Sequence, residues 1–473
     1  MLQTGISRRK LFEKGIGVAG AAGLVSAVSA RNVMAGQYSY TPDLNVFGKG
    51  AASVAIALDA AYLFLDTMMD AYAQGSTLRL IQSYSDQQGL ESTAFTYDNA
   101  VVIGAYLVRG QSGDVARAEV LGNGLLYAQK NDSFNDGRLR QAYFVNAPDA
   151  HGAYIQPAGA PFYFFGSSVG DMAWAGMALA QLYYATKNSN YLNGATKLGN
   201  WINANAYDTR GAGGYTGGVD AGNNKLTYKA TEHNIDAHAL FTMLAHLTGN
   251  SAWTNKAEWA AKFIASMWNS TGGFFWTGTG SDGVTINTAN IPEDVQTWSY
   301  LAFLDKTYAA SLEWVTTNLM TIDTPQTINS KLTGNTRILG ETYASLSLRE
   351  LTPSESYDQP PDPNAVWLEG TAHTVAALLA HRMSSQSPSQ AASDLATACM
   401  LLENIRIAQQ QLGGGQTVGG TALPVGDGIV AASSVLNGGF GSSYYPNLHI
   451  GATGWSVIAA QSGNPFRRGY RSF

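Results

Sequence analysis

The chain has 473 residues, of which 45% are hydrophobic and only 13% are charged, and its formal net charge is −6 at pH 7. This composition is typical of a large folded protein and excludes an intrinsically disordered chain. There is no basic patch, which excludes nucleic acid as a partner. The single cysteine, Cys399, excludes an intrachain disulfide and a cysteine-rich metal site.

Residues 1–35 have the pattern of a bacterial export signal. Arg8 and Arg9 are followed by an apolar run rich in Gly and Ala, which ends in small residues near Ala30. This segment resembles a twin-arginine signal peptide, which implies passage of the folded chain through the twin-arginine translocase. We therefore expect a periplasmic or secreted protein. A transmembrane anchor is the alternative, but no later run of about 18 apolar residues exists, so we expect no stable membrane insertion after the signal is removed.

Residues 45–466 are predicted to form one all-α catalytic domain built from alternating helices of two kinds. In chain order, amphipathic helices are expected at 50–75, 112–129, 188–202, 249–264, 306–319 and 387–409. Helices that are apolar on nearly all sides are expected at 97–110, 170–186, 232–249, 292–307, 367–381 and 449–461. Because a helix that is hydrophobic all round is buried, the second set should lie inside the first.

Six inner and six outer helices predict an (α/α)6 toroid, with minor hairpins in loops such as 272–278 and 411–426. An open helical solenoid is the alternative. The toroid is favoured because the chain ends with an inner-type helix, which can close against the first inner helix. In such a ring all inner helices point the same way, so their N-terminal ends surround one cavity.

Polar and aromatic residues gather at these N-terminal ends. The catalytic candidates are Asp98, Glu232, Asp294 and Glu369, and the substrate-binding candidates are Tyr97, His233, Asp236, Gln296, Trp298, Trp367, Tyr445 and His449. Sugars suit such a surface, since their C–H faces stack on aromatic rings and glycosidic cleavage needs two carboxyl groups. Each acid also has a structural interpretation as a helix cap, and Thr231 is read as the N-cap residue beside Glu232.

The sequence predicts no metal site and no cofactor. His233 and His238 are five residues apart, which is a poor spacing for one helix face, and no zinc, calcium or phosphate-loop motif is present. The glycine-rich "GGGQTVGG" lacks a following Lys-Ser or Lys-Thr and is interpreted as a loop.

The segments "TYDNAV", "TEHNID", "DVQTW" and "WLEGTA", together with the alternating helices, resemble the six-hairpin (α/α)6 glycosidase-like superfamily. The resemblance implies a glycoside hydrolase that cleaves a glucan-like poly- or oligosaccharide with inversion. It implies Glu232 as the general acid and Asp98 as the base, with Glu369 and Asp294 as alternatives. Two other readings stay open: a sugar epimerase or polysaccharide lyase that uses His233, His449 or Tyr97, and a non-catalytic glycan-binding envelope protein.

Overall fold

A computed structural model describes residues 51–86, 90–156, 163–353 and 359–470, with the side chains of 51–57 excepted. The predicted signal peptide, residues 1–35, lies outside this part of the chain. None of the described helices is long and apolar enough to cross a membrane.

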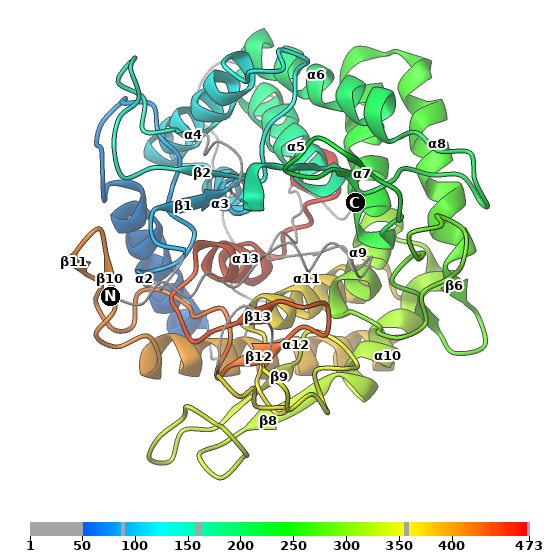
Figure 1. Ribbon diagram of the computed structural model, residues 1–473. Helices are drawn as coiled ribbons and strands as arrows, with labels where there is room; N and C mark the ends of the chain where they lie inside the picture. The colour runs from blue at the N-terminus through cyan, green and yellow to red at the C-terminus, as the bar shows by residue number, and fades with distance from the viewer. Residues whose placement is uncertain (1–50, 87–89, 157–162, 354–358, 471–473) are drawn as a thin grey trace.

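The inner helices form a closed ring (Figure 1). They are α3 (Thr96–Arg109), α5 (Val169–Thr186), α7 (Thr231–Thr248), α9 (Glu293–Phe303), α11 (Leu368–Ser384) and α13 (Ile450–Ala460). Each packs against the next, and α13 packs against α3. The prediction of a toroid is therefore confirmed, and the open solenoid is wrong.

The outer layer consists of α2 (Ala51–Met69), α4 (Ser112–Lys130), α6 (Ser189–Ala206), α8 (Ser251–Ser266), α10 (Ala310–Asn318) and α12 (Pro388–Gln411). The boundaries match the sequence prediction closely except at α2, which ends at Met69 and not at residue 75, and at α9. That helix ends at Phe303 because Leu304 adopts a left-handed conformation, with φ of 51°, and its N–H donates to the carbonyl of Tyr300 at 2.7 Å. A short 3-10 helix, η3 (Lys306–Ala309), then leads into α10.

Glycine allows neighbouring inner helices to approach closely. A Cβ atom at Gly176 of α5 would lie 2.7 Å from Leu240 of α7, and one at Gly454 of α13 would lie 2.6 Å from Val101 of α3. Both distances are shorter than van der Waals contact, so a larger residue would push the helices apart. The small residues of the inner helices thus permit six rods to pack around one axis.

The strands are short and all pair antiparallel in the loops. The pairs are β1 (Thr93–Phe95) with β2 (Ala142–Phe144), β6 (Trp268–Asn269) with β7 (Phe274–Phe275), β8 (Met320–Asp323) with β9 (Ile338–Glu341), β10 (Thr417–Val418) with β11 (Thr421–Ala422), and β12 (Leu436–Asn437) with β13 (Ser443–Tyr444). A three-stranded sheet joins β3 (Ser167–Ser168), β4 (Gly218–Val219) and β5 (Lys225–Leu226). Both predicted loop hairpins are present.

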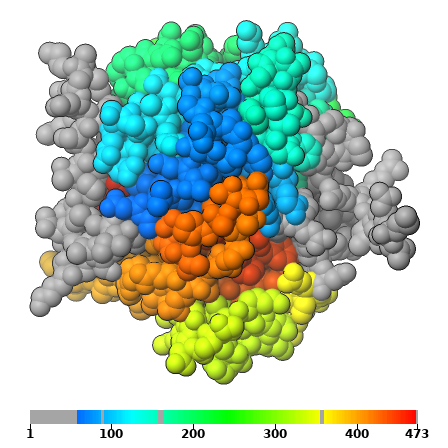
Figure 2. Space-filling view, turned by 90° about the vertical axis from the view of Figure 1, so that its left-hand side faces the viewer, coloured from blue at the N-terminus to red at the C-terminus, as the bar shows by residue number. Residues whose placement is uncertain are grey.

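The ring is closed by contacts between the two ends of the described chain. Helix α2 packs against α12 and α13, and in the space-filling view the blue surface of the first residues borders the orange surface around residue 400 (Figure 2). The segment after α2 also pairs with the segment before α13: the Ser85 N–H donates to the Leu448 carbonyl at 2.8 Å, and the Ile450 N–H donates to the Ser83 carbonyl at 3.0 Å. This pairing carries residues 83–85 to the N-terminal end of α13.

The segment 461–470 crosses the opposite end of the barrel. Asn464 donates to the carbonyl of Leu301 at 2.9 Å, and the Phe466 ring packs against the rings of Trp174 and Trp298. These apolar rings fill the axis below the N-terminal ends of the inner helices, so the polar end of the barrel has an aromatic floor.

Candidate active site

The acids at the starts of α3 and α7 are not helix caps. The N-cap positions are Phe95 and Ala230, and neither makes a side-chain capping bond. The prediction that Thr231 is the N-cap residue is therefore wrong: Thr231 is the first residue of α7, and its hydroxyl donates to the Trp276 carbonyl at 2.7 Å. Asp98 and Glu232 lie within the first turns of their helices and do not occupy the N-cap positions.

Asp171 of α5 is different because it does take part in capping. The Ser168 hydroxyl accepts from the Asp171 N–H at 3.0 Å and donates to the Asp171 carboxyl group at 2.6 Å. Burial is the main cause that raises the pKa of Asp171 to about 7, and the charge of Asp98 also raises it. Asp171 thus stabilises the start of α5, and the charge of Asp98 contributes to its raised pKa.

The four predicted catalytic carboxyl groups come together at one place. Burial raises the pKa of the Tyr444 phenol, and the charges of Glu369, Asp294, Glu232 and Asp98 all raise it further. These carboxyl groups come from α11, α9, α7 and α3, so they approach one tyrosine from four sides of the ring. All four are almost completely buried.

One side of the site is a cluster of crowded carboxyl groups, and no cation from the described residues is among the causes of their pKa shifts. Burial raises the pKa of Glu232 and of Asp236, and repulsion by Asp294 is the next cause for both. Burial also raises the pKa of Asp294 to about 7. Neighbouring like charges disfavour simultaneous ionisation, so the cluster retains protons near neutral pH.

The other side of the site is a chain of hydrogen-bonding groups around His449. Its Nε2 lies 3.2 Å from Oδ2 of Asp98, and its Nδ1 lies 3.4 Å from Oε2 of Glu369. The other oxygen of Glu369 accepts from the Tyr97 hydroxyl at 2.6 Å, and Trp455 donates to the same hydroxyl at 3.0 Å. Neither oxygen of Asp98 has a well-aligned hydrogen bond from a described residue, so this carboxylate can accept one from a bound molecule.

A separate buried network joins α9 to α11. Glu293 contacts Nδ1 of His373 at 2.8 Å and accepts from the Thr374 hydroxyl at 3.0 Å. Burial raises the pKa of Glu293 and lowers the pKa of His373, so both groups favour their neutral forms. The His373 ring packs against the rings of Trp367 and Trp455.

Several substrate-binding candidates are engaged in packing or backbone contacts. The Gln296 amide donates to the carbonyls of Phe275 and Pro292, and its oxygen accepts from the Phe275 N–H. Trp298 and Trp367 are fully buried and stack edge-on against His373. The Gln296 contacts hold β7 against α9, and the two tryptophans are part of the buried core.

The remaining candidates lie nearer the carboxyl groups. Burial lowers the pKa of His233 to about 4, so the imidazole is neutral, and its Nδ1 has no hydrogen-bond partner among the described residues. Gly170 makes room for it, since a Cβ atom there would lie 2.8 Å from the His233 ring. Tyr445 is buried, and its carbonyl accepts from the Ala432 N–H at 3.3 Å. His238 faces outward instead, with Nδ1 3.0 Å from the Ala257 carbonyl of α8.

Sequence reasoning missed two aromatic residues of the site, Tyr84 and Tyr343. Tyr84 stacks on His449, and Tyr343 lies beside Tyr444, with ring centroids 5.6 Å apart. Tyr84 and Tyr343 occur in short segments without helical or strand periodicity, so no pattern marked them. Their adjacency to the site depends entirely on where the loops fold.

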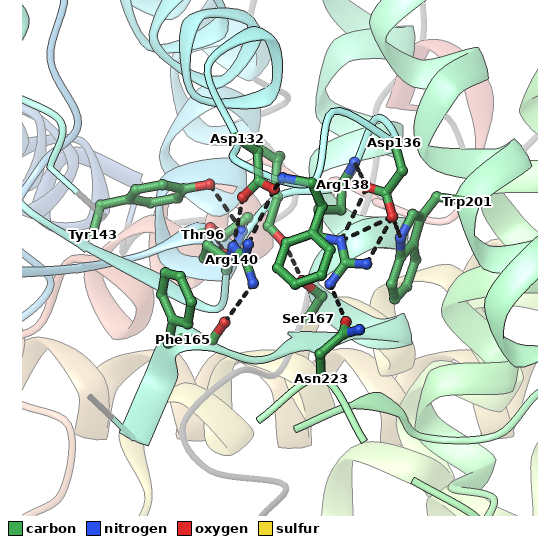
Figure 3. A network of polar contacts seen from close by, with 12 residues as sticks. Thr96, Asp132, Asp136, Arg138, Arg140, Tyr143, Phe165, Ser167, Trp201 and Asn223 are labelled. Atoms are coloured by element: carbon green, nitrogen blue, oxygen red, sulfur yellow. Dashed lines mark hydrogen bonds and ion pairs between the residues drawn. The ribbon is translucent and has the colours of Figure 1, made fainter. Parts of the chain in front are cut away.

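The start of α3 is held by a network of buried charges (Figure 3). The Thr96 hydroxyl donates to the Arg140 carbonyl at 2.6 Å. The Arg140 guanidinium is almost fully buried, donates to Asp132 at 3.0 Å and stacks on the Phe165 ring. This ion pair therefore fixes the backbone from which Tyr97 and Asp98 project.

Among the described residues, no group of three or more His, Cys, Asp or Glu side chains is arranged to hold a metal ion. Within the carboxyl cluster, burial and mutual repulsion favour the protonated forms of Glu232 and Asp236, whereas the oxygens of Asp98 are available as acceptors.

Comparisons with known proteins agree with the architecture. No protein-family model matches the sequence, and no curated protein matches it. Among solved structures, a D-mannose isomerase is similar with a TM-score of 0.58 and 12% identity, over 89% of this chain and 99% of that chain. A glycosidase variant in complex with glucose has a TM-score of 0.54 and 10% identity, over 87% and 98% of the two chains.

An inactive variant of a family 76 α-1,6-mannanase from a Salegentibacter species, in complex with α-1,6-mannotriose, is also similar. Its TM-score is 0.51 at 12% identity, over 86% of this chain and 99% of that chain. At such low identity the likeness concerns the fold and does not assign residues. The chain therefore has the fold of an (α/α)6 toroid, and in this fold it is similar to the isomerase and glycosidase structures.

Proposed function

We propose that this protein is an exported glycoside hydrolase that cleaves a poly- or oligosaccharide by general acid and base catalysis. The observation that carries the proposal is the division of the site into two electrostatic environments. Glu232, Asp236 and Asp294 are crowded and retain protons, whereas Asp98 has unpaired carboxylate oxygens beside His449. Carboxyl groups with such different environments are suited to the separate roles of acid and base.

In the proposed reaction, Glu232 donates a proton to the glycosidic oxygen as the bond from that oxygen to the anomeric carbon breaks. Asp98 accepts a proton from a water molecule whose oxygen attacks the anomeric carbon. Asp294 is the alternative acid. Helices α3 and α9 are opposite each other in the ring order, so Asp98 and Asp294 come from opposite sides of the ring. We propose inversion, in which the two carboxyl groups are far enough apart for a water molecule to enter between them.

The test is a screen of purified protein for sugar release. The panel contains α- and β-glucans, α-1,6-mannooligosaccharides and aryl glycosides, because the structures of similar fold include a glycosidase with glucose and an α-1,6-mannanase with mannotriose. We expect turnover by the wild type and its loss in Glu232→Gln and Asp98→Asn, with glycan binding retained in calorimetry. Proton NMR of the first product reveals inversion or retention. No turnover of any glycan would refute the hydrolase proposal.

A sugar isomerase or epimerase is the second candidate, and His233 is the observation that favours it. Its imidazole is neutral because burial lowers its pKa to about 4, and a neutral imidazole is able to remove a proton from a carbon next to a carbonyl group. The similar D-mannose isomerase gives the first substrate to try. Formation of D-fructose from D-mannose, with deuterium uptake from D2O and its loss in His233→Ala, would support this candidate over hydrolysis.

Export is proposed from the sequence alone. Arg8 and Arg9 are the pair that the twin-arginine translocase would recognise. In a bacterial host, the double variant Arg8→Lys and Arg9→Lys should leave the full-length chain in the cytoplasm, whereas the wild type appears shortened outside it. Equal export of both chains would contradict the proposal.

A further inference from the structure

The two ring nitrogens of His449 have different hydrogen-bonding requirements. Nδ1 accepts a hydrogen bond from the N–H of Ala452, 3.2 Å away, because His449 is the N-cap residue of α13. A backbone N–H is an obligatory donor, so Nδ1 has to present a lone pair. The proton of the ring therefore resides on Nε2, and Nε2 is the nitrogen that lies 3.2 Å from Asp98.

Glu369 approaches the same ring nitrogen from another side. Its Oε2 lies 3.4 Å from Nδ1 of His449. A carboxylate at this position would be repelled by the lone pair that accepts from Ala452, whereas a carboxylic acid is able to turn its O–H toward that lone pair and share it with the Ala452 N–H. Burial raises the pKa of Glu369 and the charge of Asp98 raises it further, which favours the acid form. The Tyr97 hydroxyl fixes the rotation of the carboxyl group by donating to Oε1 at 2.6 Å.

The packing leaves little room for another arrangement. A Cβ atom at Gly451 would lie 2.6 Å from Cε1 of His449 and 2.8 Å from Oδ1 of Asp98. The absence of a side chain at this position is therefore what allows the imidazole and the carboxylate to meet at the start of α13.

We propose that Glu369 is a positioning residue and not a catalytic carboxylate: held by Tyr97, it keeps its proton and holds the His449 ring, whose tautomer the Ala452 N–H sets, with Nε2 on the side of Asp98. The proposal rests on the proposed function only for the role of Asp98 as the base. In this proposal Glu369 orients His449, and the proton transfers belong to Asp98 and to the cluster of Glu232 and Asp294.

The first test compares Glu369→Gln with Glu369→Ala on whichever glycoside the wild type hydrolyses. A glutamine amide donates to Nδ1 and accepts from Tyr97, as the protonated acid does. We expect Glu369→Ala to lower kcat on the order of 100-fold or more with KM nearly unchanged, because the imidazole loses its orientation. Glu369→Gln should recover most of this loss. Equal loss in both variants would overturn the proposal, since it would mean that Glu369 itself transfers a proton.

The second test needs no activity. Nitrogen NMR of protein labelled with 15N-histidine reports which ring nitrogen of His449 carries the proton. Because the Ala452 N–H sets the tautomer, we expect a protonated Nε2 and an unprotonated Nδ1 in the wild type and in both Glu369 variants. The Nδ1 signal of Glu369→Gln should stay close to that of the wild type, and that of Glu369→Ala should shift because the contact at 3.4 Å is lost. An unshifted Nδ1 signal in Glu369→Ala would overturn the proposal. Glu293→Ala is the matched control, because it removes a similar buried Glu–His contact elsewhere in the barrel and should leave the His449 signals unchanged.

The two tests separate the possible failures. If no glycoside is hydrolysed, the proposed function fails while the NMR measurement still decides the tautomer. If the wild-type His449 carries its proton on Nδ1, or on both nitrogens near neutral pH, the positioning role is wrong whatever the substrate. Circular dichroism of each variant confirms that a loss of kcat is not a loss of folding.

Discussion

Tyr84 lies flat against His449, with ring centroids 4.1 Å apart and planes inclined by only 4°. The two residues also face each other in an antiparallel backbone bridge, so the stack is built on paired chain segments. One segment follows α2 and the other precedes α13. Segments from the first and last parts of the described chain therefore meet at the His449 imidazole. The stack therefore couples closure of the fold to the orientation of a group that touches Asp98.

Replacing Tyr84 tests this coupling. Tyr84→Phe retains the ring, and we expect it to keep kcat close to that of the wild type. Tyr84→Ala opens space beside the imidazole, so kcat should fall by at least about tenfold while the protein stays folded, because misorientation of a group in the site is costly. Steady-state kinetics together with thermal unfolding check this. A similar kcat for the alanine variant would show that the stack is dispensable.

Glu341 on β9 should make the protein less stable as the pH rises. Burial raises its pKa to about 8, whereas an exposed glutamate titrates near 4.5. Between these two values the folded state holds a proton that the unfolded state has lost. The free energy of unfolding therefore falls with increasing pH, by up to about 1.4 kcal/mol per unit from this one group, and becomes independent of it above pH 8.

Glu341→Gln removes this titration while keeping the size of the side chain. The difference in unfolding free energy between the variant and the wild type should grow in favour of the variant from pH 5 to pH 8. Urea unfolding at several pH values measures it, and the other titrating groups cancel in the comparison. A constant difference over this range would contradict the neutral form of Glu341.

The buried ion pair at the start of α3 should be important for stability. Asp132→Ala leaves the Arg140 guanidinium buried without its partner, and we expect a cost of about 3–5 kcal/mol in unfolding free energy. Glu403→Ala is the matched control, because it breaks an exposed pair with Arg406 on α12 and should cost less than about 1 kcal/mol. Equal effects in the two variants would mean that the buried ion pair does not stabilise the start of α3.

The helical ring could be predicted because its pattern is local. Segments such as 170–186 are apolar on every side, and that alone places them inside. The common direction of the inner helices then brings Asp98, Glu232 and Glu369 to one end without any knowledge of contacts. What the sequence could not provide is the partner of each acid, because the contact of Glu369 with Tyr97 joins residues 272 positions apart.

Capping was the weakest part of the sequence interpretation. Thr231 has a residue type that favours an N-cap position, yet it is the first residue of α7 and bonds to the Trp276 carbonyl. Tertiary contact with the loop before α9 overrides the local preference. Loop residues such as Tyr84 and Tyr343 were beyond prediction for a similar reason, since their positions depend on pairings that no periodicity reveals.

The crowded acid side of the site should set the upper pH limit of activity. Reaction requires a proton on this cluster, and burial raises the pKa of Asp294 to about 7, so kcat/KM should decline as the pH rises through about 7. Repulsion by Asp236 contributes to the raised pKa of Glu232. Asp236→Asn removes that repulsion, so the variant should lose its proton at lower pH and the alkaline decline should move to lower pH.

A pH–rate profile of Asp236→Asn against the wild type measures this shift. Asp394→Asn is the matched control, because Asp394 is equally buried but pairs with His381 on the outer side of α11 and should leave the profile unchanged. If the alkaline decline of Asp236→Asn stays where it is in the wild type, Glu232 does not depend on Asp236 for its proton. The proposed role of Glu232 as the general acid would then be wrong.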